Sequence, residues 1–169
     1  WLQNAAATFR RADNADGLVN ALNNLGLVYK NLREWREATR FLEQALKLNP
    51  NNAQAYHDRG LAYRDKGDSG RAIADFDQAI KLDANYTIAY YNRGLAYRDK
   101  GDYDRAIADF DQSIKFSPNT ATAWHDRGLA FRDKGDSDRA IRDFDQAIKL
   151  DPKDARARYF QAVAMDLSG

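Results

Sequence analysis

The stretch Gly94–Asp102 reads GLAYRDKGD, and the same nine letters stand at Gly60–Asp68 and return with one change, as GLAFRDKGD, at Gly128–Asp136. The leading glycines are 34 residues apart, and the same spacing leads back to Gly26 in NLGLVYK. A fixed period of this length indicates a repeat array, in which each unit packs mainly on its neighbours. The period therefore predicts the fold class before local propensities are considered.

Each unit contains two amphipathic helices. We number the unit so that the shared glycine is position 8, which places position 1 at Val19, Ala53, Thr87 and Ala121. Positions 4, 8 and 11 are apolar or glycine and share one face of a first helix, and positions 20, 21, 24, 27 and 28 predict a second. Between them, a glycine at position 15 can end one helix and an aspartate at position 16 can cap the next. The unit is a helical hairpin that must stack on another to bury its apolar face.

The pattern of an aromatic residue at position 4, Gly at 8, Tyr or Phe at 11, Ala at 20, Phe at 24, Ala at 27 and Pro at 32 resembles the tetratricopeptide repeat family. The resemblance implies an all-α, right-handed superhelical α-solenoid of antiparallel helix pairs. The predicted repeats are residues 19–52, 53–86, 87–120 and 121–154. Residues 1–18 are interpreted as the second helix and linker of a truncated preceding repeat, and residues 155–169 as a capping or truncated first helix. One departure is Arg33, which stands where the turn glycine is expected.

Composition argues against several classes of partner. The 26 basic and 25 acidic side chains give a net charge of +1, so no overall field attracts nucleic acid. No apolar run reaches the roughly 18–20 residues of a membrane span. The chain has no cysteine, which excludes disulfides and thiolate metal sites but is compatible with any compartment. We therefore expect no nucleic-acid partner and no membrane insertion.

No constellation of residues points to catalysis. His57 and His125 lie two repeats apart, too far for one metal ion with bonds near 2 Å to bind both. No nucleophile motif and no glycine-rich phosphate loop after a strand is present. We expect a non-enzymatic protein with no catalytic residues, no metal and no cofactor.

One face of the first helices carries the candidate binding surface. Position 9 is leucine in every repeat, and we call Leu27, Leu61, Leu95 and Leu129 the groove leucines. Position 12 supplies a basic rail of Lys30, Arg64, Arg98 and Arg132, and position 5 adds His57, Tyr91 and His125. In tetratricopeptide arrays this face lines a concave groove that holds peptides, so the resemblance implies a protein or peptide partner with apolar anchors and acidic groups. The alternative is that the leucines only pack against neighbouring first helices.

Two positions change together along the chain. Position 7 is Leu25 where position 23 is Phe41, whereas arginine at position 7 accompanies aspartate at position 23 in the other three repeats. The charged pairs are Arg59 with Asp75, Arg93 with Asp109, and Arg127 with Asp143. This pattern predicts a structural ion pair between the two helices of each hairpin.

The C-terminal helix has an unusual distribution of apolar residues. Residues 155–169 align with a first helix, but the core-facing position 4 is Arg158. Apolar side chains fall instead on the groove-side face, namely Tyr159, Phe160, Val163 and Leu167. Exposed patches of this kind mark interfaces. Homotypic assembly through the incomplete ends, giving a homo-oligomer, is therefore the alternative function.

Overall fold

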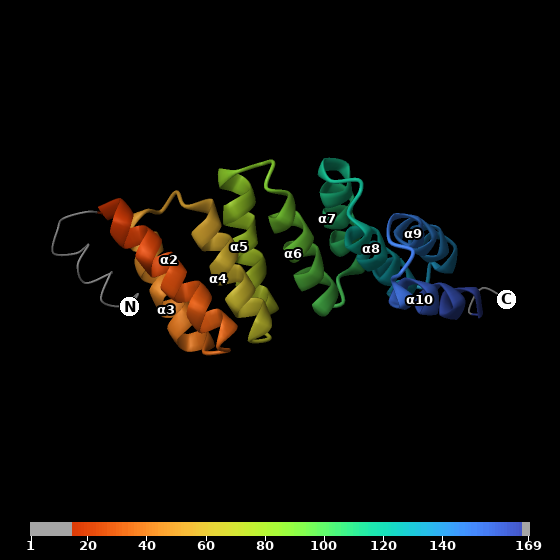
Figure 1. Cartoon of the computed structure of the whole chain (residues 1–169), viewed down its shortest axis with the longest axis horizontal. Helices are drawn as coiled ribbons and strands as arrows, with labels where there is room; N and C mark the ends of the chain where they lie inside the picture. Colours follow the sequence, from red (N-terminus) through yellow and green to blue (C-terminus); the bar gives the residue numbers. More distant parts are fainter. Residues whose placement is uncertain (1–14, 167–169) are drawn as a thin grey trace. The chain divides into compact units, whose positions relative to one another are not determined.

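The computed structural model describes residues 15–166, and every regular element in this part of the chain is an α-helix (Figure 1). The all-α class predicted from the repeat period is confirmed for these residues. The described residues form two compact units, which divide between Tyr86 and Thr87. Residues 1–14 of the predicted preceding repeat, and Leu167 of the predicted self-association surface, lie outside the described residues. Within residues 15–166, no helix has the length and apolar character needed to cross a bilayer.

The first unit contains two helical hairpins, α2 with α3 and α4 with α5. The hairpins stack because α3 packs on α4, and the first helices α2 and α4 are also in contact. The helices span α2 Ala15–Asn31, α3 Trp35–Leu48, α4 Ala53–Asp65 and α5 Ser69–Leu82. α2 begins inside the segment that the sequence analysis assigned to the preceding repeat and its linker.

The second unit repeats this arrangement and adds one helix. α6 pairs with α7 and α8 pairs with α9, while α7 packs on α8 and α10 packs on α9. The first helices α6 and α8 are in contact, as are α8 and α10. The helices span α6 Thr87–Asp99, α7 Tyr103–Phe116, α8 Ala121–Asp133, α9 Ser137–Leu150 and α10 Ala155–Asp166.

Glycine and aspartate form the turn inside a hairpin. Gly67 has φ of 88°, a left-handed conformation that glycine adopts without steric cost. The Asp68 amide donates to the Tyr63 carbonyl oxygen at 2.8 Å, which satisfies a carbonyl at the end of α4. The Asp68 carboxylate accepts from the Arg71 amide at 3.1 Å and caps α5. The turns at Gly101 and Gly135 have the same bonds.

The first turn reaches the same geometry with other residues. Arg33 occupies the glycine position with φ of 60°, and the Glu34 amide donates to the Tyr29 carbonyl oxygen at 2.9 Å. Glu34 makes no side-chain capping bond to α3. The backbone path of the turn is therefore retained, although this repeat has neither the glycine nor the capping aspartate of the other turns.

A phenylalanine at position 24 fills the crossing of the two helices. Phe76, Phe110 and Phe144 are fully buried, and Leu42 takes this place in the first repeat. Each lies on the glycine at position 8 of the paired helix: a Cβ atom at Gly60 would lie 2.7 Å from Phe76 Cε1. Such a distance is a steric clash, so the glycine is required for the close approach of α4 and α5. Fully buried alanines at positions 3, 10 and 20 complete the close packing.

The predicted ion pair between positions 7 and 23 is confirmed in three repeats. In the second repeat, Arg59 Nε and Nη2 donate to the two carboxylate oxygens of Asp75 at 2.8 and 2.7 Å. The equivalent bidentate pairs join Arg93 to Asp109 and Arg127 to Asp143. The aspartates are buried, and burial raises the pKa of Asp75 although Arg59 opposes this shift. In the first repeat, Leu25 and Phe41 are buried in an apolar cluster instead.

Candidate functional site

The groove leucines are half-buried in both units. Leu27 and Leu61 lie on α2 and α4, which are in contact, and Leu95 and Leu129 lie on the contacting helices α6 and α8. Leu129 packs against the core cluster that contains Phe131 and Phe144. Each leucine therefore presents only part of its surface to solvent, and Leu129 combines that exposure with a packing role.

The histidines at position 5 are buried, which differs from the expectation that they contribute surface to a groove. His57 and His125 are 6% and 5% exposed. The Tyr86 ring lies 5.2 Å from the His57 ring, and the Phe160 ring lies 5.8 Å from the His125 ring. Burial lowers the pKa of His125, so its imidazole is neutral at pH 7. The two histidines are buried rather than exposed because residues that follow the second helix of each repeat, Tyr86 and Phe160, pack on their rings.

Parts of the basic rail are engaged by carboxylates of the chain itself. Asp126 on α8 accepts a hydrogen bond from the Tyr91 hydroxyl at 2.5 Å and one from Arg98 Nη1 at 3.0 Å. Arg132 donates to Asp133 at 2.6 Å, and its guanidinium lies 4.6 Å from the centre of the Phe160 ring. These pairings reduce the positive charge that the rail presents in the second unit.

A buried polar cluster lies beside His57 in the first unit. Asp58 is 2% exposed and accepts from Gln54 Nε2 at 2.9 Å, while its second oxygen, Oδ2, is buried without a hydrogen-bond partner. The Tyr86 hydroxyl donates to Gln54 Oε1 at 2.5 Å. Burial, with the negative charges of Asp58 and Asp83, raises the pKa of Tyr86 to about 12. Tyr86 therefore remains a neutral donor that closes the cluster.

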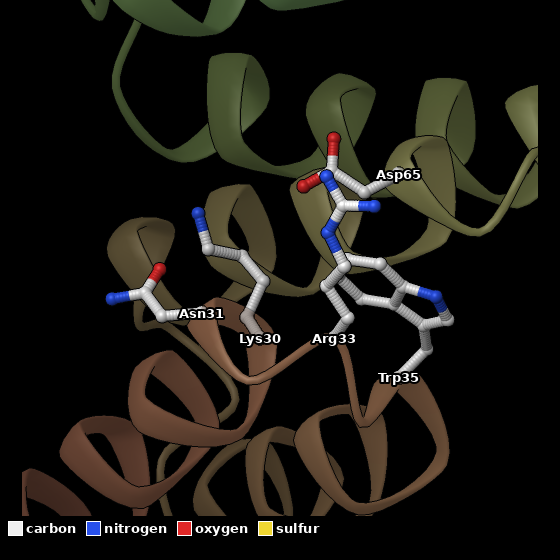
Figure 2. A pocket seen from close by; sticks show the side chains of 5 residues that line it. All are labelled: Lys30, Asn31, Arg33, Trp35 and Asp65. Atoms are coloured by element: carbon white, nitrogen blue, oxygen red, sulfur yellow. The ribbon is translucent and has the colours of Figure 1, made fainter.

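A polar pocket of about 390 Å³ lies at the turn between α2 and α3 (Figure 2). Lys30 and Asn31 line it from the end of α2, Arg33 from the turn, Trp35 from the start of α3 and Asp65 from the end of α4. Figure 2 shows the Lys30 side chain rising from the end of α2 and the Arg33 side chain rising from the turn, on the side where Asp65 projects from α4. The repeat pattern does not predict this pocket, although Arg33 in the glycine position indicates that this turn differs from the others.

A second, smaller pocket of about 240 Å³ lies within the second unit. It is bounded by the start of α6, the end of α7 and the beginning of α8, and five of its residues carry aliphatic hydroxyl groups. The lining residues are Thr87, Ile88, Tyr91, Ser113, Ser117, Thr120 and Thr122. Only Tyr91 among them belonged to the predicted site.

The residues of the predicted self-association surface on α10 differ in how far they are exposed to solvent. Tyr159 is 63% exposed, whereas Phe160 and Val163 are half-buried. The Phe160 ring stacks at 6.3 Å from the Phe144 ring and forms part of the core of the second unit. Phe160 is therefore occupied by packing on α8 and α9 within the chain.

Residues 15–166 contain no group of three or more His, Cys, Asp or Glu side chains placed to hold a metal ion. The carboxylates instead make ion pairs and helix caps, as Asp75 and Asp68 do.

Models of the tetratricopeptide repeat match residues 19–52, 57–121 and 94–165. MamA, known from a crystal structure, has 28% sequence identity to this chain. The two structures superimpose with a TM-score of 0.76 over 89% of this chain and 96% of that one. A thermophilic protein of Thermus thermophilus, TTC0263, is 20% identical, with a TM-score of 0.71 over 98% of this chain and 99% of that one. The structure of the first tetratricopeptide repeat domain of Spaghetti (RPAP3) was solved with the HSP90 peptide SRMEEVD bound. That domain is 19% identical in sequence, with a TM-score of 0.66 over 68% of this chain and 90% of that one. A search of curated proteins gave no significant match.

Proposed function

The chain belongs to the tetratricopeptide repeat family, and from this premise we propose that it is a protein-interaction scaffold that binds a peptide or helix of a partner on the face of the groove leucines. The RPAP3 domain is bound to a peptide, which supports a peptide as the kind of occupant. The proposal concerns two stretches of surface, one on α2 and α4 and one on α6 and α8.

The partial exposure of the leucines carries this proposal. The alanines at position 10 of the second, third and fourth repeats are fully inaccessible, as expected of residues that serve packing alone, whereas leucine recurs at position 9 in all four repeats and is only half-buried. Half-exposed leucines on adjacent helices give a partner apolar area to bury, at about 25 cal/mol per Å². The partner therefore needs apolar anchor residues.

Acidic groups on the partner would make a smaller contribution. Arg98 and Arg132 already contact carboxylates of this chain, so an acidic ligand must compete with Asp126 and Asp133. Exposed ion pairs contribute about 0–1 kcal/mol each. We therefore propose that the apolar anchors dominate the affinity and that the rail selects among ligands.

The test compares partner capture by the wild-type chain with capture by the double variant Leu61→Glu plus Leu95→Glu, which alters one groove leucine in each unit. Leu129 is avoided because it packs on the core. The matched control is Leu48→Glu plus Leu82→Glu, which places the same charges at exposed leucines near the ends of second helices. We expect the first variant to lose bound partners while its melting temperature stays near that of the control. If both variants retain the same partners, the groove leucines are not the binding surface.

Homotypic assembly through α10 is the second candidate function, and the 63% exposure of Tyr159 beside half-buried Val163 favours it. Phe160 is not a suitable test position because it packs on Phe144 and His125. Light scattering across a concentration series should show a mass that increases for the wild type and stays monomeric for Tyr159→Asp. A wild-type mass that stays monomeric at high micromolar concentration would contradict assembly.

A further inference from the structure

The smaller pocket of the second unit has a counterpart in the second repeat, but there a side chain of the protein itself fills it. Tyr86 and Thr120 both occupy position 34, the last residue of their repeats. The Tyr86 ring lies 5.2 Å from the His57 ring at position 5, and its hydroxyl bonds to Gln54 at position 2. In the third repeat, positions 5 and 2 are Tyr91 and Ile88, and both line the open pocket. The cavity therefore lies where an aromatic ring is seated one repeat earlier.

Thr120 leaves this cavity open because it is too small to reach across it. Capping does not explain the threonine, since Thr120 precedes α8 without a side-chain capping bond, whereas Asn52 at the same position accepts from the Ala55 amide at 3.0 Å. Ser113 lines the inner side of the cavity and is 3% exposed, and alanine stands at this position in the other repeats. The third repeat thus combines a missing ring with an uncapped helix start.

The residue at position 2 indicates which ring fits. In the second repeat the Tyr86 hydroxyl finds an acceptor in Gln54, but Ile88 in the third repeat offers only a branched apolar side chain that is 46% exposed. A phenol oxygen at that point has no acceptor equivalent to Gln54 Oε1, so the hydroxyl that fixes Tyr86 in the second repeat gains no such bond here. A phenyl ring has no such group and can pack on Ile88 and on the Tyr91 ring.

We propose that the cavity formed by Ile88, Tyr91, Ser117 and Thr120 binds a phenyl ring, namely the side chain of a phenylalanine in the partner peptide. As a peptide subsite it rests on the proposed function, because Tyr91 lies on the predicted groove face. Its capacity to bind an aromatic ring is argued only from the comparison with Tyr86 and does not depend on the proposed function. The volume of about 240 Å³ accommodates one such ring.

The first experiment uses toluene and p-cresol, which carry the side-chain rings of phenylalanine and tyrosine, and needs no partner. Methyl NMR of the full chain should show saturable shifts with toluene at Ile88, Thr87, Thr120 and Thr122, and several-fold weaker binding of p-cresol. Thr120→Tyr should seat its own ring in the cavity and weaken toluene binding at least about tenfold, since the apolar surface that the ligand buries is then already covered.

A reciprocal variant keeps the test valid if Thr120→Tyr perturbs folding. Tyr86→Thr removes the internal ring from the second repeat and should create a second toluene site, seen as new shifts at the His57 and Gln54 signals. Absence of toluene shifts from the wild type overturns the proposal, as does unchanged binding by a folded Thr120→Tyr protein.

A third arm separates the subsite from the proposed function. Peptides selected from a random phage-displayed library on the wild type, with counter-selection on Thr120→Tyr, should share a phenylalanine. If selected peptides bind and depend on Leu61 and Leu95 but carry no aromatic residue, the groove function stands and the phenylalanine subsite is wrong. If toluene binds but no selected peptide depends on those leucines, the cavity stands and the groove function is wrong.

Discussion

At position 15 of the repeat the backbone must adopt a left-handed conformation, and Arg33 does so without the freedom of glycine. Its φ is 60°, close to the 76–90° of the glycines in the other three turns. A side chain in this region is strained, and such strain is common where a residue serves a function. Arg33 also lines the polar pocket with Trp35, so the strained residue and the pocket coincide.

We predict that Arg33→Gly stabilises the protein. Relief of the left-handed strain, about 1–2 kcal/mol, outweighs the added entropy of glycine in the unfolded chain, so we expect a net gain of about 0.5–1 kcal/mol in the free energy of unfolding. Urea denaturation followed by circular dichroism measures it. Gly67→Arg is the control: nothing lies within 4 Å of its added Cβ, so the strain should appear with the opposite sign. A destabilised Arg33→Gly protein would mean that the arginine side chain makes compensating contacts.

A second residue-scale prediction concerns the buried pair Arg59–Asp75. Arg59→Leu alone leaves the Asp75 carboxylate, 7% exposed, without its bidentate partner, and should cost about 3 kcal/mol. The double variant Arg59→Leu plus Asp75→Phe reproduces Leu25 and Phe41 of the first repeat and should recover most of this loss. Thermal unfolding of the two variants and of Asp75→Phe alone completes the cycle. A double variant as unstable as the sum of the single variants would show that the two pairs are not interchangeable.

At the scale of helices, three second helices are preceded by a capping aspartate. Its carboxylate accepts hydrogen bonds from the amide and from the side chain of the same arginine. Asp102 accepts from the Arg105 amide at 3.2 Å and from Arg105 Nε at 2.6 Å. The side-chain bond from Arg105, with the backbone bond, lowers the pKa of Asp102 below its ordinary 3.8. A lowered pKa means that the folded state favours the ionised form, so this contribution is present above the ordinary pKa and is lost as the pH falls.

The element-scale prediction is that Asp102→Asn weakens the acid sensitivity of the protein. Asparagine can still cap α7, but it neither ionises nor forms the ion pair with Arg105. The wild type should therefore be the more stable protein above about pH 5, and the difference should shrink to zero as the pH falls towards about 2. Melting curves at several pH values test this. A difference that is constant across the pH range would assign the effect to cap geometry rather than to charge.

Most helices could be predicted from the sequence because their signals are local. Gly67 and Asp68 mark a turn through backbone conformation and capping. The Arg59–Asp75 contact could be predicted because both residues belong to one repeat and their two positions change together from repeat to repeat. The burial of His57 and His125 could not be predicted in this way. Tyr86 covers the first and Phe160 the second. Both contacts come from the chain that follows the hairpin, which a helical projection of one repeat does not include.

Contacts between repeats were likewise not predictable from the pattern of a single repeat. The groove leucines follow from the repeat pattern, but the pairing of Arg98 with Asp126 joins one repeat to the next. The cavity beside Thr120 and the filled place beside Tyr86 differ at position 34 and also at positions 2, 5 and 27 of the repeat. The consequence of these differences becomes visible only when the filled and open versions are compared in three dimensions.

At the scale of the whole molecule, the helix contacts found within each unit among residues 15–166 join neighbours in the repeat order. α2, for example, contacts only α3 and α4 among the described helices. Stability in such an array is a sum of repeat terms and nearest-neighbour terms, so damage in one repeat need not spread along the chain. The fully buried phenylalanines Phe76 and Phe144 lie in different units and offer equivalent positions at which to test this.

We predict that Phe76→Ala and Phe144→Ala have complementary local effects. Each leaves a core cavity and should cost about 3–5 kcal/mol in its own repeat. Amide hydrogen exchange, followed by mass spectrometry, should show Phe76→Ala losing protection in α2–α5 more than in α8–α10, and Phe144→Ala the reverse, because opening spreads first to the helices in contact. The two variants serve as controls for each other, since they remove the same side chain from the same position of the repeat. Equal loss of protection in both units by either variant would contradict nearest-neighbour coupling and show that the array opens as one cooperative body.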